Sequence, residues 1–262
     1  MRIGQHDKPI DPLPENLLTL YVSVHPPTVS VFQLRRDMAE IGRRLYERGL
    51  IVAAEGNISA RLSDGGILIT PAGMCKGRMA PDDLVVIDPS GRKRQGARLA
   101  SSEWQMHAAA LAQRPDIGAC VHAHPPYATA FAVAGVPLAE CVLPEVIATL
   151  GSVPLAPYAA PSTAAVGESL EKYIERFDAF LLKNHGVLTL GPDLESAFRK
   201  METVERLAQI VHLARSLGAV DTLSCGDVEH LLNLTQSLHS RFTGAETPVC
   251  GTCRTGGSPR PE

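Results

Sequence analysis

Residues 117–126 read IGACVHAHPP and predict a buried strand that ends in two histidines. Side chains two positions apart on a strand project from the same face of a sheet. His122 and His124 could therefore reach one metal ion at about 2.0–2.1 Å. Two histidines at this spacing also occur as ordinary packing residues at a strand end, so the motif alone leaves both interpretations open.

A third histidine favours the metal. His185 follows an expected apolar strand at residues 179–183, which residues 187–190 continue, and Gly186 beside it permits close backbone approach. Three histidines at two strand ends would leave a fourth coordination position open, which is typical of a catalytic rather than a structural zinc site. We therefore expect one metal ion bound by His122, His124 and His185.

Glu103 is the candidate acid/base. It follows Ser101 and Ser102 at an expected helix start, where the helix dipole favours a carboxylate. The residue could serve only as a capping group, or it could move a proton beside a metal-bound substrate. Its position alone leaves both interpretations open.

Three segments could bind an anion. Gly56-Asn57 precedes an expected strand, residues 70–73 (TPAG) follow another, and Ser101-Ser102 begins a helix. Exposed backbone N–H groups, hydroxyls and the positive end of a helix suit a phosphate or a carboxylate. Each segment alone is more often a turn or a cap, but their occurrence together with the histidines indicates a site.

Strands and helices are intermixed along the rest of the chain. Strands are expected at residues 57–63, 67–70, 84–88 and 117–122. Helices are expected at residues 30–48, 101–113, 127–133, 163–177, 193–217 and 228–239. The hairpins in the first half favour one three-layer α/β/α domain with a mostly antiparallel central sheet. We expect this catalytic domain at residues 28–242, an N-terminal arm at 1–27 and a flexible C-terminal tail at 243–262.

The bulk composition is that of an ordinary globular protein. The chain has 262 residues, 45% of them hydrophobic and 20% charged, which suits one large domain with a substantial core. The net charge of -3 gives no reason to expect nucleic acid or a membrane surface as a partner. No apolar stretch approaches the ~20 residues of a membrane helix. We therefore expect a cytoplasmic protein that acts on a small molecule.

The six cysteines are scattered. Cys75, Cys120 and Cys141 lie among apolar or turn residues and are expected to be reduced thiols. Cys250 and Cys253 form a single CxxC in the C-terminal tail, which without a second pair is a weak zinc or redox signal. Because the tail is rich in glycine, proline, threonine and arginine, we expect it to be inert.

Five motifs occur in a recognisable order: GNIS at 56–59, ITPAG at 69–73, SSEWQMH at 101–107, VHAH at 121–124 and NHG at 184–186. This order and approximate spacing resemble the class II aldolase/adducin family, which includes L-fuculose-phosphate aldolase and L-ribulose-5-phosphate 4-epimerase. The resemblance covers about residues 31–217. Each motif alone is weak, but together they are specific.

The resemblance implies a cofactor, an assembly and residue roles. It implies one divalent metal ion per subunit, zinc in the family's aldolases, although manganese, cobalt or iron(II) could occupy a three-histidine site. It also implies a homotetramer with active sites at subunit interfaces. The implied metal ligands are His122, His124 and His185, the implied acid/base is Glu103, and the implied substrate-phosphate ligands are Asn57, Gly73, Ser101 and Ser102.

Three departures separate the chain from the family's aldolases. Ala72 stands where their phosphate loop usually has serine or threonine, and residues 141–145 lack their aldehyde-handling tyrosine. Phe242 is the aromatic residue nearest to a second missing tyrosine. Glu145 could face the pocket, or it could simply begin a helix after Pro144. The metal half of the site therefore resembles the aldolases more than the half that recognises the second substrate.

The main hypothesis is a metal-dependent lyase that cleaves a small ketose phosphate through a metal-stabilised enediolate. The alternative is a decarboxylase of a β-keto or dihydroxy-aromatic acid, which forms a similar carbanion. Ala72 and the missing tyrosines favour an acid without phosphate, whereas Ser101 and Ser102 favour a phosphate. A sugar-phosphate 4-epimerase uses the same bond cleavage. A non-catalytic adducin-like module is the weakest hypothesis, because that branch lacks the metal ligands.

Overall fold

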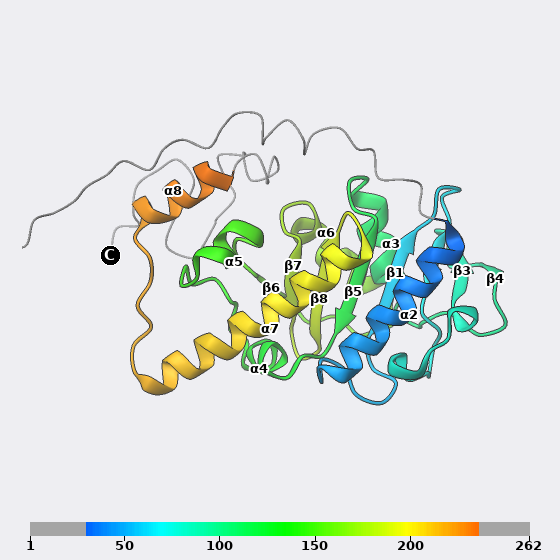
Figure 1. Cartoon of the computed structure of the whole chain (residues 1–262), viewed down its shortest axis with the longest axis horizontal. Coiled ribbons are helices and arrows are strands. Elements are labelled where there is room, and N and C mark those ends of the chain that lie inside the picture. Colours follow the sequence, from blue (N-terminus) through cyan, green and yellow to red (C-terminus); the bar gives the residue numbers. More distant parts are fainter. Residues whose placement is uncertain (1–29, 236–262) are drawn as a thin grey trace, which may run out of the picture.

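The computed structural model describes residues 30–235, which form one eight-stranded sheet between two layers of helices (Figure 1). The strands lie in the order β4 (Lys93–Gln95), β3 (Val85–Ile87), β2 (Ile67–Ile69), β1 (Asn57–Arg61), β5 (Ala119–Ala123), β8 (Gly186–Gly191), β7 (Ala179–Leu182) and β6 (Leu155–Ala156). Neighbouring strands are antiparallel except β6 and β7, which are parallel. The expected three-layer fold with a mostly antiparallel sheet is confirmed.

Helices cover both faces of the sheet. One face carries α2 (Val31–Glu47), α4 (Pro126–Ala134) and α7 (Leu194–Leu217), and the other carries α3 (Trp104–Gln113) and α6 (Ala164–Ile174) (Figure 1). Shorter elements are α5 (Pro144–Thr149), α8 (Cys225–Thr235) and the 3-10 turns η1 (Lys76–Arg78) and η2 (Pro81–Asp83). Figure 1 shows α8 at one end of the molecule, joined to α7 by an extended segment.

Alternating side chains on the strands supply two separate cores. On β5, Val121 packs in the core beneath α2 and α7, whereas Cys120 packs in the core beneath α3 and α6. His122 lies two residues after Cys120, so it projects from the same face as Cys120. The histidine end of β5 therefore opens toward the α3/α6 layer, where α3 can supply a partner.

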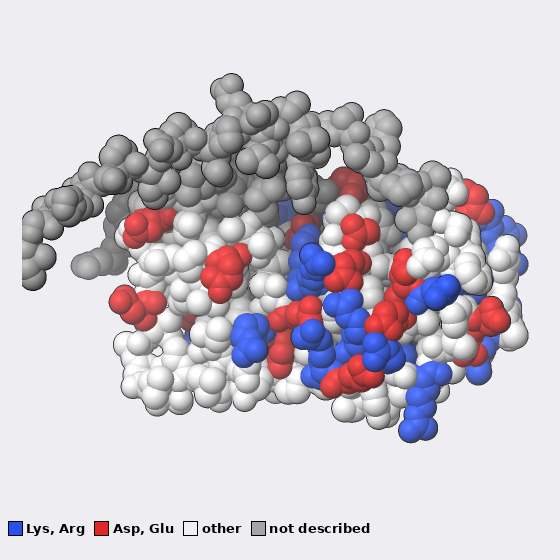
Figure 2. Space-filling model, viewed as in Figure 1, with Lys and Arg blue, Asp and Glu red and all other residues white. Residues whose placement is uncertain are grey.

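Helix α2 begins and packs as its sequence predicts. The Ser30 side chain accepts a hydrogen bond from the Gln33 backbone N–H at 3.2 Å, which caps the first turn. Met38, Ile41 and Leu45, spaced for one helical face, are buried. On the outer surfaces of α2 and α7, positively and negatively charged side chains lie next to one another (Figure 2). Such exposed ion pairs are each worth about 0–1 kcal/mol.

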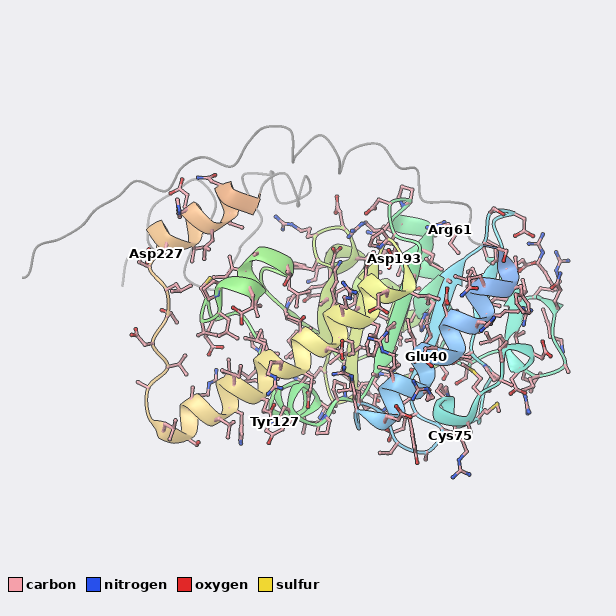
Figure 3. All side chains as sticks on the ribbon, in the orientation of Figure 1. Glu40, Arg61, Cys75, Tyr127, Asp193 and Asp227 are labelled. Atoms are coloured by element: carbon pink, nitrogen blue, oxygen red, sulfur yellow. The ribbon has the colours of Figure 1, made fainter. Side chains whose placement is uncertain are left out.

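A polar cluster fixes the C-terminal end of α3. Arg61, labelled in Figure 3 at the end of β1, donates to the carbonyl oxygens of Leu111, Arg114 and Ile117. The Arg114 guanidinium pairs with Asp178 at 2.7 Å, and Lys200 of α7 pairs with the same carboxylate at 2.6 Å. These bonds join β1, α3, the start of β7 and α7, and we name them the far cluster.

Several elements differ from the sequence-based expectation. Residues 179–190 form the antiparallel hairpin β7–β8 rather than one continued strand, because Asn184 adopts a φ of +57° and the chain reverses there. Strand β4 was not predicted, because three exposed residues are too few to show a hydrophobic period. Strand β6 lies in residues 144–161, where a short helix and extended segments were expected without exact bounds. No helix within the described residues is long and apolar enough to span a membrane.

The cysteines divide into two kinds. Cys75 and Cys120 are free thiols, as expected. Cys141 is disulfide-bonded, as is Cys225, so the expectation that Cys141 is reduced was wrong. Cys141 packs with Val228 of α8 in a small cluster that the sequence could not place. The arm at 1–27, the tail at 243–262, Phe242 and the CxxC at 250–253 lie outside the described residues.

Candidate metal centre

Strand β5 carries His122 into the site. Its ring is fully buried, and Nδ1 lies 2.9 Å from the carbonyl oxygen of Val187 on β8. A carbonyl only accepts, so Nδ1 carries the proton and Nε2 keeps an available lone pair. Burial lowers the pKa of His122 well below its ordinary value, and His185 and His124 lower it further. His122 is therefore a neutral imidazole, which is the form that binds metal.

His124 follows β5 where two glycines leave room for the chain. A Cβ added to Gly186 would lie 2.6 Å from His124 Cδ2 and 2.5 Å from the carbonyl oxygen of Ala123. Gly56 has a φ of +65°, and a Cβ there would lie 2.7 Å from the carbonyl oxygen of His122. Close packing of the strands that carry the histidines therefore requires glycine at both positions.

The turn between β7 and β8 presents His185. Asn184 supplies its left-handed conformation, which asparagine tolerates better than most residues. The His185 N–H donates to the carbonyl oxygen of Leu182 at 3.0 Å, and the ring centroid lies 4.7 Å from that of His122. Burial lowers the pKa of His185, an effect that Glu103 opposes and His124 reinforces.

The three imidazoles converge on one point. One ligand nitrogen from each lies within 4.8 Å of the other two, and the Nε2 atoms of His122 and His124 are 3.1 Å apart. Tetrahedral coordination at metal–nitrogen distances of about 2.0–2.1 Å separates ligand nitrogens by roughly 3.3 Å. The spacing and the neutral nitrogen donors therefore fit zinc or a similar divalent ion.

Glu103 faces this cluster from the start of α3. Its Oε2 lies 3.4 Å from His122 Nε2, and its Oε1 lies 3.3 Å from His185 Nε2. Glu103 is itself the N-cap residue, so Ser101 and Ser102 precede the helix instead of opening it. The Glu103 side chain makes no capping hydrogen bond. The structure thus places the carboxylate toward the histidines rather than on the helix end.

The segments expected to bind an anion lie together. The backbone N–H of Ser101 donates to the carbonyl oxygen of Thr70, and the Thr70 N–H donates to the carbonyl oxygen of Ile58, both at 3.0 Å. Gly73 has a φ of +65° and is exposed, as is Ser102, whereas Ser101 is buried. These contacts bring the 70–73 loop, the start of β1 and the residues before α3 to the same end of the sheet.

Two residues that the sequence analysis did not assign to the site, His107 and Ser59, connect with Glu103 through Asn57. Asn57 Nδ2 donates to Glu103 Oε2 at 2.7 Å, and Asn57 Oδ1 is hydrogen-bonded to His107 Nε2. His107 Nδ1 is hydrogen-bonded to Ser59 Oγ at 2.7 Å. The available signal was the spacing: Glu103 and His107 are four residues apart on a helix, and Asn57 and Ser59 are two apart on a strand.

A third residue that the sequence analysis missed is Glu55, which lies beside His124. Glu55 Oε2 lies 3.6 Å from His124 Nδ1 and accepts the Val52 N–H at 3.2 Å. Carboxylates near the outer nitrogen of a ligand histidine commonly orient the ring. Glu145, by contrast, is exposed in the first turn of α5, as expected for a carboxylate that follows Pro144.

Comparisons with known proteins agree with this geometry. The family model "Class II Aldolase and Adducin N-terminal domain" matches residues 36–212. A 3-oxo-tetronate 4-phosphate decarboxylase of Pectobacterium atrosepticum is 33% identical over 183 residues, 68% of this chain and 84% of that protein. A 5-methylthioribulose-1-phosphate/5-deoxyribulose-1-phosphate aldolase of Rhodospirillum rubrum is 33% identical over 199 residues, 76% and 89% of the two chains. The solved structure of an L-fuculose 1-phosphate aldolase superposes with a TM-score of 0.74 at 32% identity, and the match covers 80% of this chain and 100% of that chain.

Proposed function

This chain belongs to the class II aldolase and adducin family and is a carbon–carbon lyase, and we propose that it cleaves a small ketose phosphate in a retro-aldol reaction. The observation that carries the proposal is the convergence of three imidazole nitrogens and one carboxylate at the end of β5. The aldolases of this family use a divalent metal. We propose one Zn²⁺ per subunit, held by His122, His124 and His185.

The bound metal would act as a Lewis acid on the negative charge that develops on a substrate oxygen as the carbon–carbon bond breaks. Glu103 would transfer a proton at the neighbouring substrate carbon, since its carboxylate lies 3.3–3.4 Å from two of the ligand histidines. Such proton transfer typically contributes about 10²–10⁴-fold to the rate. Asn57 holds Glu103 Oε2 at 2.7 Å and so orients the carboxylate toward the substrate.

The phosphate would bind beside Glu103. We assign this role to Asn57, Gly73, Ser101 and Ser102, which the loop contacts gather at one end of the sheet. Backbone N–H groups and the positive end of α3 favour an anion there. Ala72 removes one hydroxyl donor from the loop, so the remaining donors would hold the phosphate with fewer hydrogen bonds.

Decarboxylation of a phosphorylated 3-oxo acid is a specific second candidate. The chain is 33% identical to a 3-oxo-tetronate 4-phosphate decarboxylase, and residues 141–145 contain no tyrosine. Loss of CO₂ from a 3-oxo acid leaves negative charge on the ketone oxygen, as aldol cleavage does. A phosphate on that acid would also account for Ser101 and Ser102, which a simple β-keto acid would leave without a ligand.

Two reactions on the zinc-loaded protein distinguish the candidates. Dihydroxyacetone phosphate in D₂O should exchange a hydroxymethyl proton, followed by NMR, in either case, because loss of CO₂ from 3-oxo-tetronate 4-phosphate leaves the same enediolate. Formation of a carbon–carbon bond between dihydroxyacetone phosphate and an added aldehyde would establish the aldolase, whereas CO₂ release from 3-oxo-tetronate 4-phosphate without such bond formation would establish the decarboxylase. Elemental analysis of the same sample should give one metal per chain. A metal-loaded protein inactive in both assays would contradict both candidates.

We also propose a cytoplasmic homotetramer with sites at subunit interfaces. The support is the family itself. Light scattering should give a mass four times the 28.0 kDa of the chain. A monomeric mass for the active enzyme would contradict the shared site.

A further inference from the structure

A network of hydrogen-bonded, buried polar side chains leads from Glu103 into the sheet. Asn57 is 4% exposed, and Ser59 and His107 are fully buried. Glu103 and His107 lie on one face of α3, and Asn57 and Ser59 lie on one face of β1. Where α3 packs on β1, side chains from the two elements alternate along the hydrogen-bonded network in the order Glu103, Asn57, His107, Ser59.

The direction of each hydrogen bond in this network follows from the groups that it joins. Asn57 Nδ2 donates to Glu103 Oε2, so Asn57 turns its Oδ1 toward His107. The Asn57 oxygen can only accept, so His107 must carry its proton on Nε2. Burial lowers the pKa of His107 to about 3, so the ring is neutral and Nδ1 accepts from the Ser59 hydroxyl.

The other end of this network lies against β5. Ser59 pairs with Cys120 in the β1–β5 register. Burial raises the pKa of Cys120 to about 12, so the thiol keeps its proton. Ser59, His107 and Asn57 therefore each donate toward Glu103.

We propose that His107 and Ser59 are positioning residues that lock the Asn57 carboxamide with its NH₂ toward Glu103. The role in proton transfer rests on the proposed function of Glu103. A reversed amide would place Asn57 Oδ1 against the carboxylate and leave a buried acceptor without a donor, which is strongly unfavourable. Asn57 Nδ2 has two hydrogens, so it can orient Glu103 and still bind substrate.

The alternative is that His107 has only a structural role, in which it packs in the core and forms a hydrogen bond with Ser59. That role would need only one ring nitrogen and would not fix the Asn57 amide. The two roles predict different tautomers and different kinetics. Under the positioning role, loss of the Nε2–H donor lowers the rate of proton transfer, whereas substrate affinity and metal content stay near the wild-type values.

The first test is the tautomer of His107. Zinc-loaded protein labelled with ¹⁵N-histidine would be studied by long-range ¹H–¹⁵N NMR at pH 7, and His107 would be assigned among the nine histidines by its absence from His107→Gln. We expect a neutral ring with the proton on Nε2 and a hydrogen-bonded, unprotonated Nδ1. A proton on Nδ1 would overturn the proposal, because Asn57 would then present its oxygen to Glu103.

The second test compares two substitutions in the exchange of dihydroxyacetone phosphate protons with D₂O. Glutamine at 107 can still donate from the Nε2 position, whereas leucine cannot. We expect His107→Leu to lower the maximal rate about 10–100-fold with KM within about twofold, and His107→Gln to recover most of that loss. His230→Gln, at an exposed position on α8, is the matched control and should leave the rate unchanged.

Ser59→Ala keeps the test decisive if His107→Leu fails to fold. It leaves His107 in place but removes the donor to Nδ1, so we expect a mixture of both tautomers and a rate loss of about 3–10-fold. Equal losses in His107→Leu and His107→Gln, or losses confined to KM, would overturn the proposal. If the wild type exchanges no protons, the aldolase assignment fails, and the tautomers of the wild type and Ser59→Ala still decide the positioning role.

Discussion

Strand β1 and helix α3 each connect two polar clusters of opposite character. At one end, Asn57 and Glu103 meet three histidine nitrogens, so the cluster gathers lone pairs and a negative charge that suit a cation between them. In the far cluster at the other end, Arg114 meets a carboxylate, Asp178, so opposite charges neutralise each other. The first arrangement is poised for a ligand, whereas the second stabilises the fold. Substitutions at the two ends should therefore separate activity from stability.

The largest expected effect is on catalysis at the end of β1 and α3 that faces the three histidines, the metal end. Glu103→Gln keeps the size of the side chain and removes its capacity to move a proton. We expect proton exchange to fall about 10²–10⁴-fold, while the free energy of unfolding falls by no more than about 1.5 kcal/mol, because glutamine keeps an oxygen that can accept from Asn57. NMR exchange rates and urea denaturation measure the two quantities. A large loss of stability with little loss of rate would show that Glu103 belongs with the structural cluster.

The matching substitution in the far cluster should have the opposite effect. Asp178→Ala leaves Arg114 and Lys200 without their shared carboxylate, and removal of one partner from such a buried group costs about 3–5 kcal/mol. Urea denaturation should show this loss, while kcat stays within about twofold of the wild type. Asp221→Ala, at an exposed position between α7 and α8, is the control and should change neither. A fall in kcat with unchanged stability would break the comparison.

The contribution of Asp178 should also depend on pH. Burial alone would raise its pKa, but Lys200 and Arg114 together hold it below the ordinary value of 3.8. A carboxyl whose pKa is depressed in the folded state contributes stability above its unfolded pKa and loses it as pH falls through the folded pKa. The difference in unfolding free energy between wild type and Asp178→Ala should therefore be constant near neutral pH and shrink below about pH 4. A difference that grows on acidification would contradict this sign.

A smaller effect is expected from crowding the histidines. Gly186→Ala places a methyl group 2.6 Å from His124 Cδ2 and should turn that ring out of line. We expect metal affinity to fall about 10–100-fold, measured by competition with a chelating dye. Gly226→Ala is the matched control, since its nearest neighbour, the Ser224 hydroxyl, would be 3.8 Å away. Unchanged affinity in Gly186→Ala would show that His124 is not held where the structure places it.

The sequence predicted most of the sheet and the identity of the convergent histidines, because these depend on local patterns. Residues 57–63 alternate in polarity and the turn at residues 64–66 leads into β2, while His122 and His124 share a face by strand geometry alone. The predicted Asn184-His185-Gly186 segment was correctly placed at a strand end, but its reversal into β8 depends on one left-handed residue.

The polar network behind Glu103 could not be predicted, since it depends on contacts between distant segments. Ser59 and His107 are 48 positions apart, and only the packing of α3 on the sheet brings them together. The sequence shows their spacing to Asn57 and Glu103 but not that the two pairs interleave. The disulfide at Cys141 was missed for the same reason, because α5 and α8 meet only in the folded chain.

The most direct test of the metal end is to locate the ion. An anomalous difference map at the zinc absorption edge, from crystals of the zinc-loaded protein, would place the metal independently of any substrate. We predict one peak per chain at about 2.0–2.1 Å from the Nε2 atoms of His122, His124 and His185. Absence of a peak there, or a peak elsewhere with this triad empty, would contradict the assignment of these three histidines as the catalytic metal site.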